Sequence, residues 1–201
     1  MLPEPTSRLT PPDERKRLLA LARSAIRSYV LDRRLPEGAA PPQSGQRQGV
    51  FVTLHSSGRL RGCIGRPESS DSLDSLVELC AVLAASRDPR FPPVQAHEVD
   101  ALDIELSILS PPEPWPAPDV LARFEPGVHG VAISCAAFRG LLLPQVALQY
   151  GWSAQRFLEE TCRKAGLPAQ AWRDPDVRIE IFTAEVFSES EFPASPAEAV
   201  G

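Results

Sequence analysis

The sequence predicts an α+β protein with a mainly antiparallel sheet, flanking helices and two lobes. Residues 101–110 alternate apolar and polar side chains, as expected for a half-buried strand. Residues 49–65 and 127–144 have the turn and apolar pattern of hairpins, and segments with helical spacing lie between them. Strands and helices are therefore mixed, and hairpins dominate over crossover units. With 201 residues and 43% hydrophobic content, the chain can bury a sizeable core.

Two helices are expected around the first hairpin. Thr10, followed by two prolines and Asp13, is expected to cap a helix that ends near Arg34. Residues 35–48 have the composition of a loop that leads into the hairpin. Ser72 is expected to cap the second helix. Its apolar stripe comprises Leu73, Leu76, Val77, Cys80, Leu83 and Ala84.

The second half begins with two proline-rich loops that enclose the strand at 101–110. These are residues 88–94 and residues 111–118, and the latter is the expected boundary between the lobes. The remaining elements follow in chain order. They are two short strands joined by a turn near Ala136–Gly140, a helix from Pro144, a helix from the cap Ser153 to about Ala165 with Gly166 as its stop, and a long strand over 176–189.

Composition and charge narrow the function classes. The formal net charge of −5 and a pI of about 5.3 argue against nucleic-acid binding by bulk electrostatics. No leader-like stretch opens the chain, and no apolar run reaches the ~18 residues of a membrane span, so a cytoplasmic protein is expected. The four cysteines are expected to be free thiols. The spacing of cysteines and histidines predicts no metal site, and no cofactor motif is present.

The hairpin contains the hexapeptide "LRGCIG", residues 60–65. A three-residue loop, Ser56–Gly58, would place Phe51 opposite Cys63 and Thr53 opposite Arg61. One face would then be apolar, made of Val50, Val52, Leu54, Leu60, Gly62 and Ile64. The other face would gather Phe51, Thr53, His55, Arg59, Arg61 and Cys63. A two-residue loop would mix apolar and charged residues on both faces, so the three-residue loop is favoured.

Two interpretations of Cys63 follow from this register. A guanidinium beside a thiol favours the thiolate, so Cys63 and Arg61 are candidate catalytic residues. A nucleophilic cysteine also needs a base, and His55 would lie two cross-strand steps away. Alternatively, Cys63 is a small apolar filler, while Gly62 and Gly65 make room for a neighbouring element.

Three further residues are candidates for binding. Arg90 lies in the rigid loop "DPRFPPV", where it could hold an anion or simply pair with Asp88. His129 lies between glycines in "GVHG", and Gln145 follows Pro144 at a helix start. For both residues a structural role is the simpler alternative.

Over about residues 12–190, the sequence resembles the AmmeMemoRadiSam system protein A family, also called the AMMECR domain family. The resemblance rests on "GVFVTLHSSGRLRGCIG", "DPRFPPV", "DIELSILSPPEP", "GLLLPQVALQYGW" and "TCRKAGLP", and "LRGCIG" is the family hallmark. It implies a larger and a smaller lobe in a single domain over 12–190, with 1–11 and 191–201 as flexible tails. The stretch "VAISCAAFRG" departs from the glycine- and arginine-rich turn expected there.

The resemblance also implies partners, namely a Memo-like protein related to extradiol dioxygenases and a radical SAM protein. Its motif positions are residues 60–65, with Arg90, His129 and Gln145 as further binding candidates. Arg59, on the predicted polar face of the hairpin, is also a binding candidate. The expected function is an accessory or binding component of a modification pathway. Two alternatives stay open: an enzyme that uses Cys63 and Arg61 on an unidentified substrate, and an RNA- or protein-binding adaptor unrelated to modification.

Overall fold

The computed structural model describes residues 10–34 and 48–192, and it divides into two compact units. Unit 1 comprises the described residues through Leu109 together with those from Glu185 onward, and unit 2 spans Ser110–Ala184. The predicted tails lie largely outside the described residues, as does nearly all of the predicted loop over 35–48. The combination of helices with antiparallel strands confirms the α+β class.

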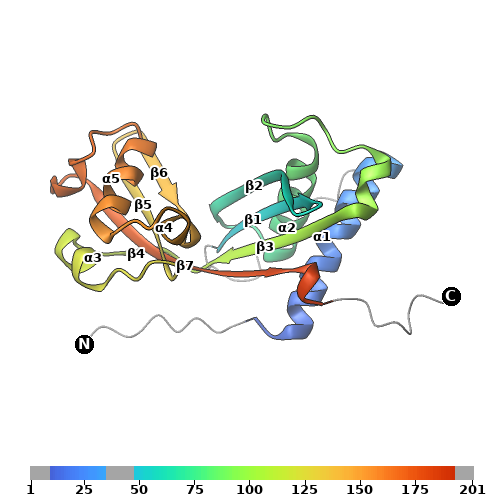
Figure 1. The fold of residues 1–201 in the computed structure, drawn as a ribbon, viewed down its shortest axis with the longest axis horizontal. Helices are drawn as coiled ribbons and strands as arrows, with labels where there is room; N and C mark the ends of the chain where they lie inside the picture. Colours follow the sequence, from blue (N-terminus) through green and yellow to red (C-terminus); the bar gives the residue numbers. More distant parts are fainter. Residues whose placement is uncertain (1–9, 35–47, 193–201) are drawn as a thin grey trace. The chain divides into compact units, whose positions relative to one another are not determined.

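Unit 1 is a sheet covered by two helices (Figure 1). Its strand order is β2-β1-β3-β7, so β2 is an edge strand. Helix α2 packs on β1 and β2, and α1 packs on α2 and β3. The elements are α1 (Pro12–Asp32), β1 (Gln48–Ser56), β2 (Arg59–Ser69), α2 (Leu73–Ser86), η1 (Ala96–Ala101), β3 (Leu102–Leu109), the end of β7 (Arg178–Ser188) and η3 (Glu189–Glu191).

Unit 2 has its own core around Phe157 and Val131. In it, β7 pairs with β5, β5 pairs with β6, and the short β4 also pairs with β7. The elements are β4 (Glu113–Pro114), α3 (Ala117–Arg123), β5 (His129–Cys135), β6 (Phe138–Leu142), α4 (Pro144–Tyr150), α5 (Ala154–Lys164), η2 (Ala171–Arg173) and the first part of β7.

Several local predictions are confirmed. The hydroxyl of Ser72 accepts a hydrogen bond from Ser75 N, and Ser153 accepts one from Arg156 N, so both cap their helices. Gly166 has a φ of 80° after α5, as predicted for a stop residue. Cys80 is buried in the core of unit 1. All four cysteines are free.

The predicted cap of the first helix is wrong. Pro11 occupies the N-cap position of α1 and makes no side-chain cap bond. Thr10 instead donates from its backbone N and its hydroxyl to the carboxylate of Glu185, at 3.0 and 2.7 Å from Oε2. A charged acceptor from a distant strand therefore outcompetes the local capping bond. The turn between β5 and β6 is also shorter than predicted, because only Ala136 and Ala137 lie between the strands.

The predicted hairpin loop is wrong as well. Ser56 pairs with Arg59, so the loop consists of Ser57 and Gly58 alone. Their φ values are 50° and 74°. Positive φ at both central residues is the mark of a type I′ turn, whose twist matches that of the flanking strands.

A β-bulge at Arg61 then shifts the register. His55 pairs with Leu60, but the next pair is Leu54 with Gly62, so Arg61 has no partner of its own on β1. Cys63 consequently pairs with Thr53, whereas Phe51 was predicted. Leu60, predicted to face the core, is 41% exposed. The rest of the predicted apolar face is confirmed, with Val50, Val52, Leu54 and Gly62 buried and Ile64 half-buried.

Candidate functional site

Cys63 lies half-buried on the edge strand of unit 1, on the face opposite the helices. It forms a row with Thr53 on β1 and Glu105 on β3, because both pair with Thr53. The Thr53 hydroxyl donates a hydrogen bond to the Cys63 sulfur at 3.3 Å. Sulfur is a weak hydrogen-bond acceptor, so this contact is weaker than a hydrogen bond between two oxygens.

Asp88 and Arg90 occupy the outer edge of β2 at Cys63. The backbone N–H of Cys63 donates to Asp88 Oδ2 at 2.8 Å, and Arg90 Nη2 donates to the Cys63 carbonyl oxygen at 3.4 Å. Asp88 and Arg90 also bind each other, with Arg90 Nη2 at 2.7 Å from Asp88 Oδ2. Two side chains of the loop thus supply the donor and acceptor that another strand would supply, which protects the sheet edge.

Asp88 is the charged centre of this arrangement. Its side chain is 2% exposed, whereas that of Arg90 is 54% exposed. The hydrogen bond from Arg90 keeps the pKa of Asp88 well below its usual range, and the backbone N–H groups of Cys63 and Arg90 add to the effect. These contributions outweigh the desolvation of the carboxylate. Asp88 is therefore ionised at neutral pH, and its carboxylate holds the loop against β2.

Arg61 is fully engaged. Its Nε and Nη2 bind Glu98 Oε1 and Oε2 at 2.8 and 2.9 Å, and its Nη1 donates to the Pro92 carbonyl oxygen at 2.9 Å. This bidentate pair lowers the pKa of Glu98 to about 2, mainly through the hydrogen bonds from Arg61. The guanidinium therefore holds residues 92–98 against β2.

The two motif glycines provide clearance. A Cβ on Gly62 would lie 2.4 Å from the carbonyl oxygen of Ala84 in α2. A Cβ on Gly65 would lie 2.3 Å from the Phe51 ring. Any side chain at either position forces the neighbouring element to move, which supports the packing interpretation of these glycines.

Two carboxylates of this site were not among the sequence candidates. Glu98 lies 37 positions after its partner Arg61, and nothing local in the sequence marks the pair. Glu105 lies in the row with Cys63, and burial raises its pKa against the influence of nearby His55. The alternation at 101–110 predicted that Glu105 lies on the polar face of its strand, but not which residues share its row.

The remaining candidates are not part of the Cys63 cluster. Arg59 is exposed at the start of β2. His129 and Gln145 belong to unit 2. The His129 ring packs against Trp115 and Nδ1 accepts a hydrogen bond from Glu125 N, while burial lowers its pKa. Gln145 is exposed in the first turn of α4.

The fold and site define an α+β protein whose larger unit carries a cysteine on an edge hairpin. Two ion pairs, Arg61–Glu98 and Arg90–Asp88, flank that hairpin. The family description AMMECR1 matches residues 19–187, and the chain belongs to the AMMECR1 family. This confirms the resemblance found in the sequence. None of the helices in the described part of the chain is long and apolar enough to cross a membrane.

Archaeal relatives match most of the chain. A Methanothermobacter thermautotrophicus protein is 46% identical over 185 residues, which cover 88% of this chain and 95% of the relative. Protein TK0174 of Thermococcus kodakarensis is 42% identical over 188 residues, which cover 89% of this chain and 91% of the relative. The crystal structure of the uncharacterized protein PH0010 from Pyrococcus horikoshii matches with a TM-score of 0.74 and 39% identity, covering 85% of this chain and 89% of that chain.

Proposed function

We propose that this protein is an accessory or binding component of a modification pathway, with a Memo-like protein and a radical SAM protein as its partners. The observation that carries this proposal is the engagement of Arg61. Its guanidinium is occupied by Glu98 and the Pro92 carbonyl, so it is not free to activate the thiol or bind a substrate anion. The hallmark hexapeptide then serves to position a loop.

The neighbours of Cys63 support a binding role over catalysis. A nucleophilic cysteine is commonly activated by an adjacent base. The cross-strand partner of Cys63 is a hydroxyl. The carboxylate of Asp88 binds the backbone N–H of Cys63 and the guanidinium of Arg90. His55 pairs with Leu60 and Asp103, one row beyond Thr53 on the same face.

The surface that the hairpin positions is the loop over 88–94. Arg90 is half-exposed and stacks at 5.5 Å over the Phe91 ring. Pro92 and Pro93 are exposed and restrict the backbone, so the loop loses little entropy when a partner binds it. A rigid arginine and proline surface beside a sheet edge is well suited to protein recognition.

The test measures the affinity of the purified chain for each partner by calorimetry. Cys63→Ser should leave the dissociation constant within about twofold, and Arg61→Ala should weaken binding tenfold or more because residues 92–98 are released. Glu98→Gln is the matched control, since it weakens the same ion pair from the other side and should reduce affinity in the same direction. No detectable complex with either partner would overturn the proposal.

One observation favours an enzyme as the second candidate. The Thr53 hydroxyl donates a hydrogen bond to the Cys63 sulfur, the atom that would act as the nucleophile. Thr53→Val removes that donor at almost constant volume. A Cys63 alkylation rate that falls severalfold in this variant at neutral pH supports the enzyme, and an unchanged rate supports the binding role.

A further inference from the structure

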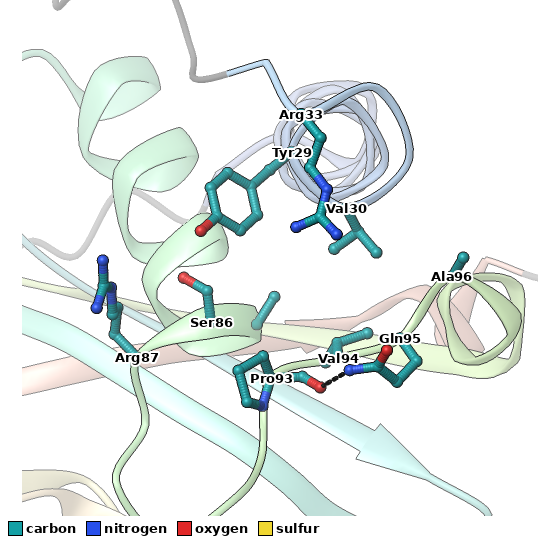
Figure 2. Close-up of a pocket in the computed structure, with 10 residues that line it drawn as sticks. Tyr29, Val30, Arg33, Ser86, Arg87, Pro93, Val94, Gln95 and Ala96 are labelled. Atoms are coloured by element: carbon teal, nitrogen blue, oxygen red, sulfur yellow. Dashed lines mark hydrogen bonds between the residues drawn. The ribbon is translucent and has the colours of Figure 1, made fainter.

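A pocket of about 360 Å³ lies in unit 1 between the C-terminal ends of α1 and α2 and the segment over 93–96 (Figure 2). Neither Cys63 nor Arg61 lines it. Its volume is within the range of small-molecule sites, ~300–1,000 Å³. Its charged lining residues are Arg33, at the end of α1, and Arg87, at the end of α2.

Both arginines lack a carboxylate partner within the described residues. Other arginines of unit 1, namely Arg17, Arg23, Arg27, Arg61 and Arg90, each form an ion pair. The carboxylates of Asp88, in the loop over 88–94, and of Glu98, in η1, already pair with Arg90 and Arg61. Nothing else in the described lining offsets the two positive charges.

A purely structural role at the helix ends does not account for the guanidinium groups. Cationic side chains near a helix C-terminus commonly bind its last carbonyl groups. Here the backbone amides do so instead: those of Arg33 and Arg34 donate to Ser28 O, and that of Arg87 donates to Leu83 O. The side chains of Arg33 and Arg87 stay available.

Charge balance favours an anion. Each helix C-terminus contributes a partial charge of about −0.5, so two ends offset roughly one of the two guanidinium charges. About one positive charge is left over for a ligand. The helix ends alone would favour a cation, but the two side chains outweigh them.

The rest of the lining combines hydroxyl groups with apolar surface. Figure 2 shows the Tyr29 hydroxyl and the Ser86 side chain facing each other, with the Arg33 guanidinium beside Val30 and above Val94. The Ser86 hydroxyl donates to Val82 O at 2.7 Å and keeps its lone pairs. Among the described residues, Tyr29 has no side-chain hydrogen-bond partner.

We propose that this pocket binds a small organic oxyanion, a phosphate or carboxylate attached to a compact apolar body. Arg33 and Arg87 bind the anionic group, the Tyr29 hydroxyl donates a further hydrogen bond, and Val30 and Val94 contact the body of the ligand. The two surfaces share Pro93 and Val94. Partner binding depends on Arg61, whereas anion binding depends on Arg33 and Arg87, so substitutions at these arginines let the two proposals fail separately.

Titration of the full chain with phenyl phosphate and with benzoate, followed by NMR, tests the proposal, and phenol is the neutral control. At least one anion should bind saturably with shifts at residues 29–33, 85–87 and 93–96, while phenol binds more than tenfold more weakly. The anion that binds more tightly shows whether the pocket prefers a phosphate or a carboxylate. Arg33→Gln with Arg87→Gln should weaken binding tenfold or more.

Arg34→Gln is the matched control. It removes the same charge from the neighbouring residue, which does not line the pocket, and should leave affinity within about twofold. Absence of saturable binding by either anion would overturn the proposal. So would equal weakening by Arg34→Gln, because the effect would then be one of net charge.

Discussion

Arg61 illustrates how a residue's partners decide its role. In sequence it stands two positions from Cys63 and suggests thiol activation. In the structure it sits on a bulge, so its side chain leaves the regular register and reaches Glu98 and Pro92. The side chain that was expected to serve the thiol therefore holds the neighbouring loop.

The Arg61–Glu98 pair predicts a pH dependence of stability. The pKa of Glu98 is about 2 when folded and ~4.3 in an unfolded chain. The lower folded value means that the pair stabilises fully above about pH 4.3 and that this stability is lost as the pH falls towards 2. Between pH 6 and pH 2.5, the free energy of unfolding in urea should fall for both proteins. The fall should be smaller by roughly 1–2 kcal/mol in Glu98→Gln than in the wild type.

Glu113→Gln, at an exposed position in unit 2, is the control. Its free energy of unfolding should change with pH as that of the wild type does. If Glu98→Gln has the same pH dependence as the wild type, the ion pair does not contribute as described.

The four cysteines should differ sharply in reactivity. Burial raises the pKa of Cys80 to about 11 and also raises that of Cys162, while Cys63 and Cys135 are half-buried. Iodoacetamide at pH 8 should therefore modify only Cys63 and Cys135 in the folded protein. Mass spectrometry of timed samples measures this, with urea-unfolded protein as the reference. Rapid labelling of Cys80 without urea would contradict its place in the core.

Some side-chain contacts could be predicted and others could not. Pairing of Asp88 with Arg90 was one of the sequence alternatives, because residues two apart in a tight loop can meet. The bond from Cys63 N to Asp88 spans 25 positions and depends on where the loop lies against β2. Such contacts follow from tertiary packing, which periodicity does not encode.

At the scale of elements, the hairpin shows where pattern reasoning fails. The two-residue loop was rejected because it would mix apolar and charged residues on each face. A single bulge at Arg61 removes that conflict, since it restores the alternation from Gly62 onward. The positive φ of Ser57 also had no indication in its residue type. Apart from Leu60, the core face was thus predicted correctly, with the wrong partners across the strands.

Packing of β2 against α2 predicts the effect of a methyl group at Gly62. The added Cβ would lie 2.4 Å from a backbone oxygen, which cannot rotate away. Gly62→Ala should therefore lower the free energy of unfolding by about 1–3 kcal/mol, measured by urea denaturation. Gly58→Asn is the control, because its turn position has open space and asparagine tolerates positive φ. Equal stability of Gly62→Ala and wild type would show that β2 does not pack closely on α2.

At the scale of the whole molecule, the class and the order of the longer elements could be predicted, because caps, alternation and helical stripes are local. The short elements η1, β4 and α3 were not predicted. The division into units was expected at residues 111–118 and falls just before them, between Leu109 and Ser110. That β7 contributes to both units depends on pairing across distant parts of the chain, which no local pattern reports.

We propose that the hallmark hairpin positions a binding surface and that Cys63 does no chemistry. Reconstitution of the pathway from this chain, the Memo-like protein and the radical SAM protein tests it most directly, with modified product as the readout. We predict that Cys63→Ser retains output within about twofold, while Arg61→Ala reduces output in proportion to its lost affinity. Loss of output in Cys63→Ser with partner affinity unchanged would contradict the claim and assign the thiol a chemical role.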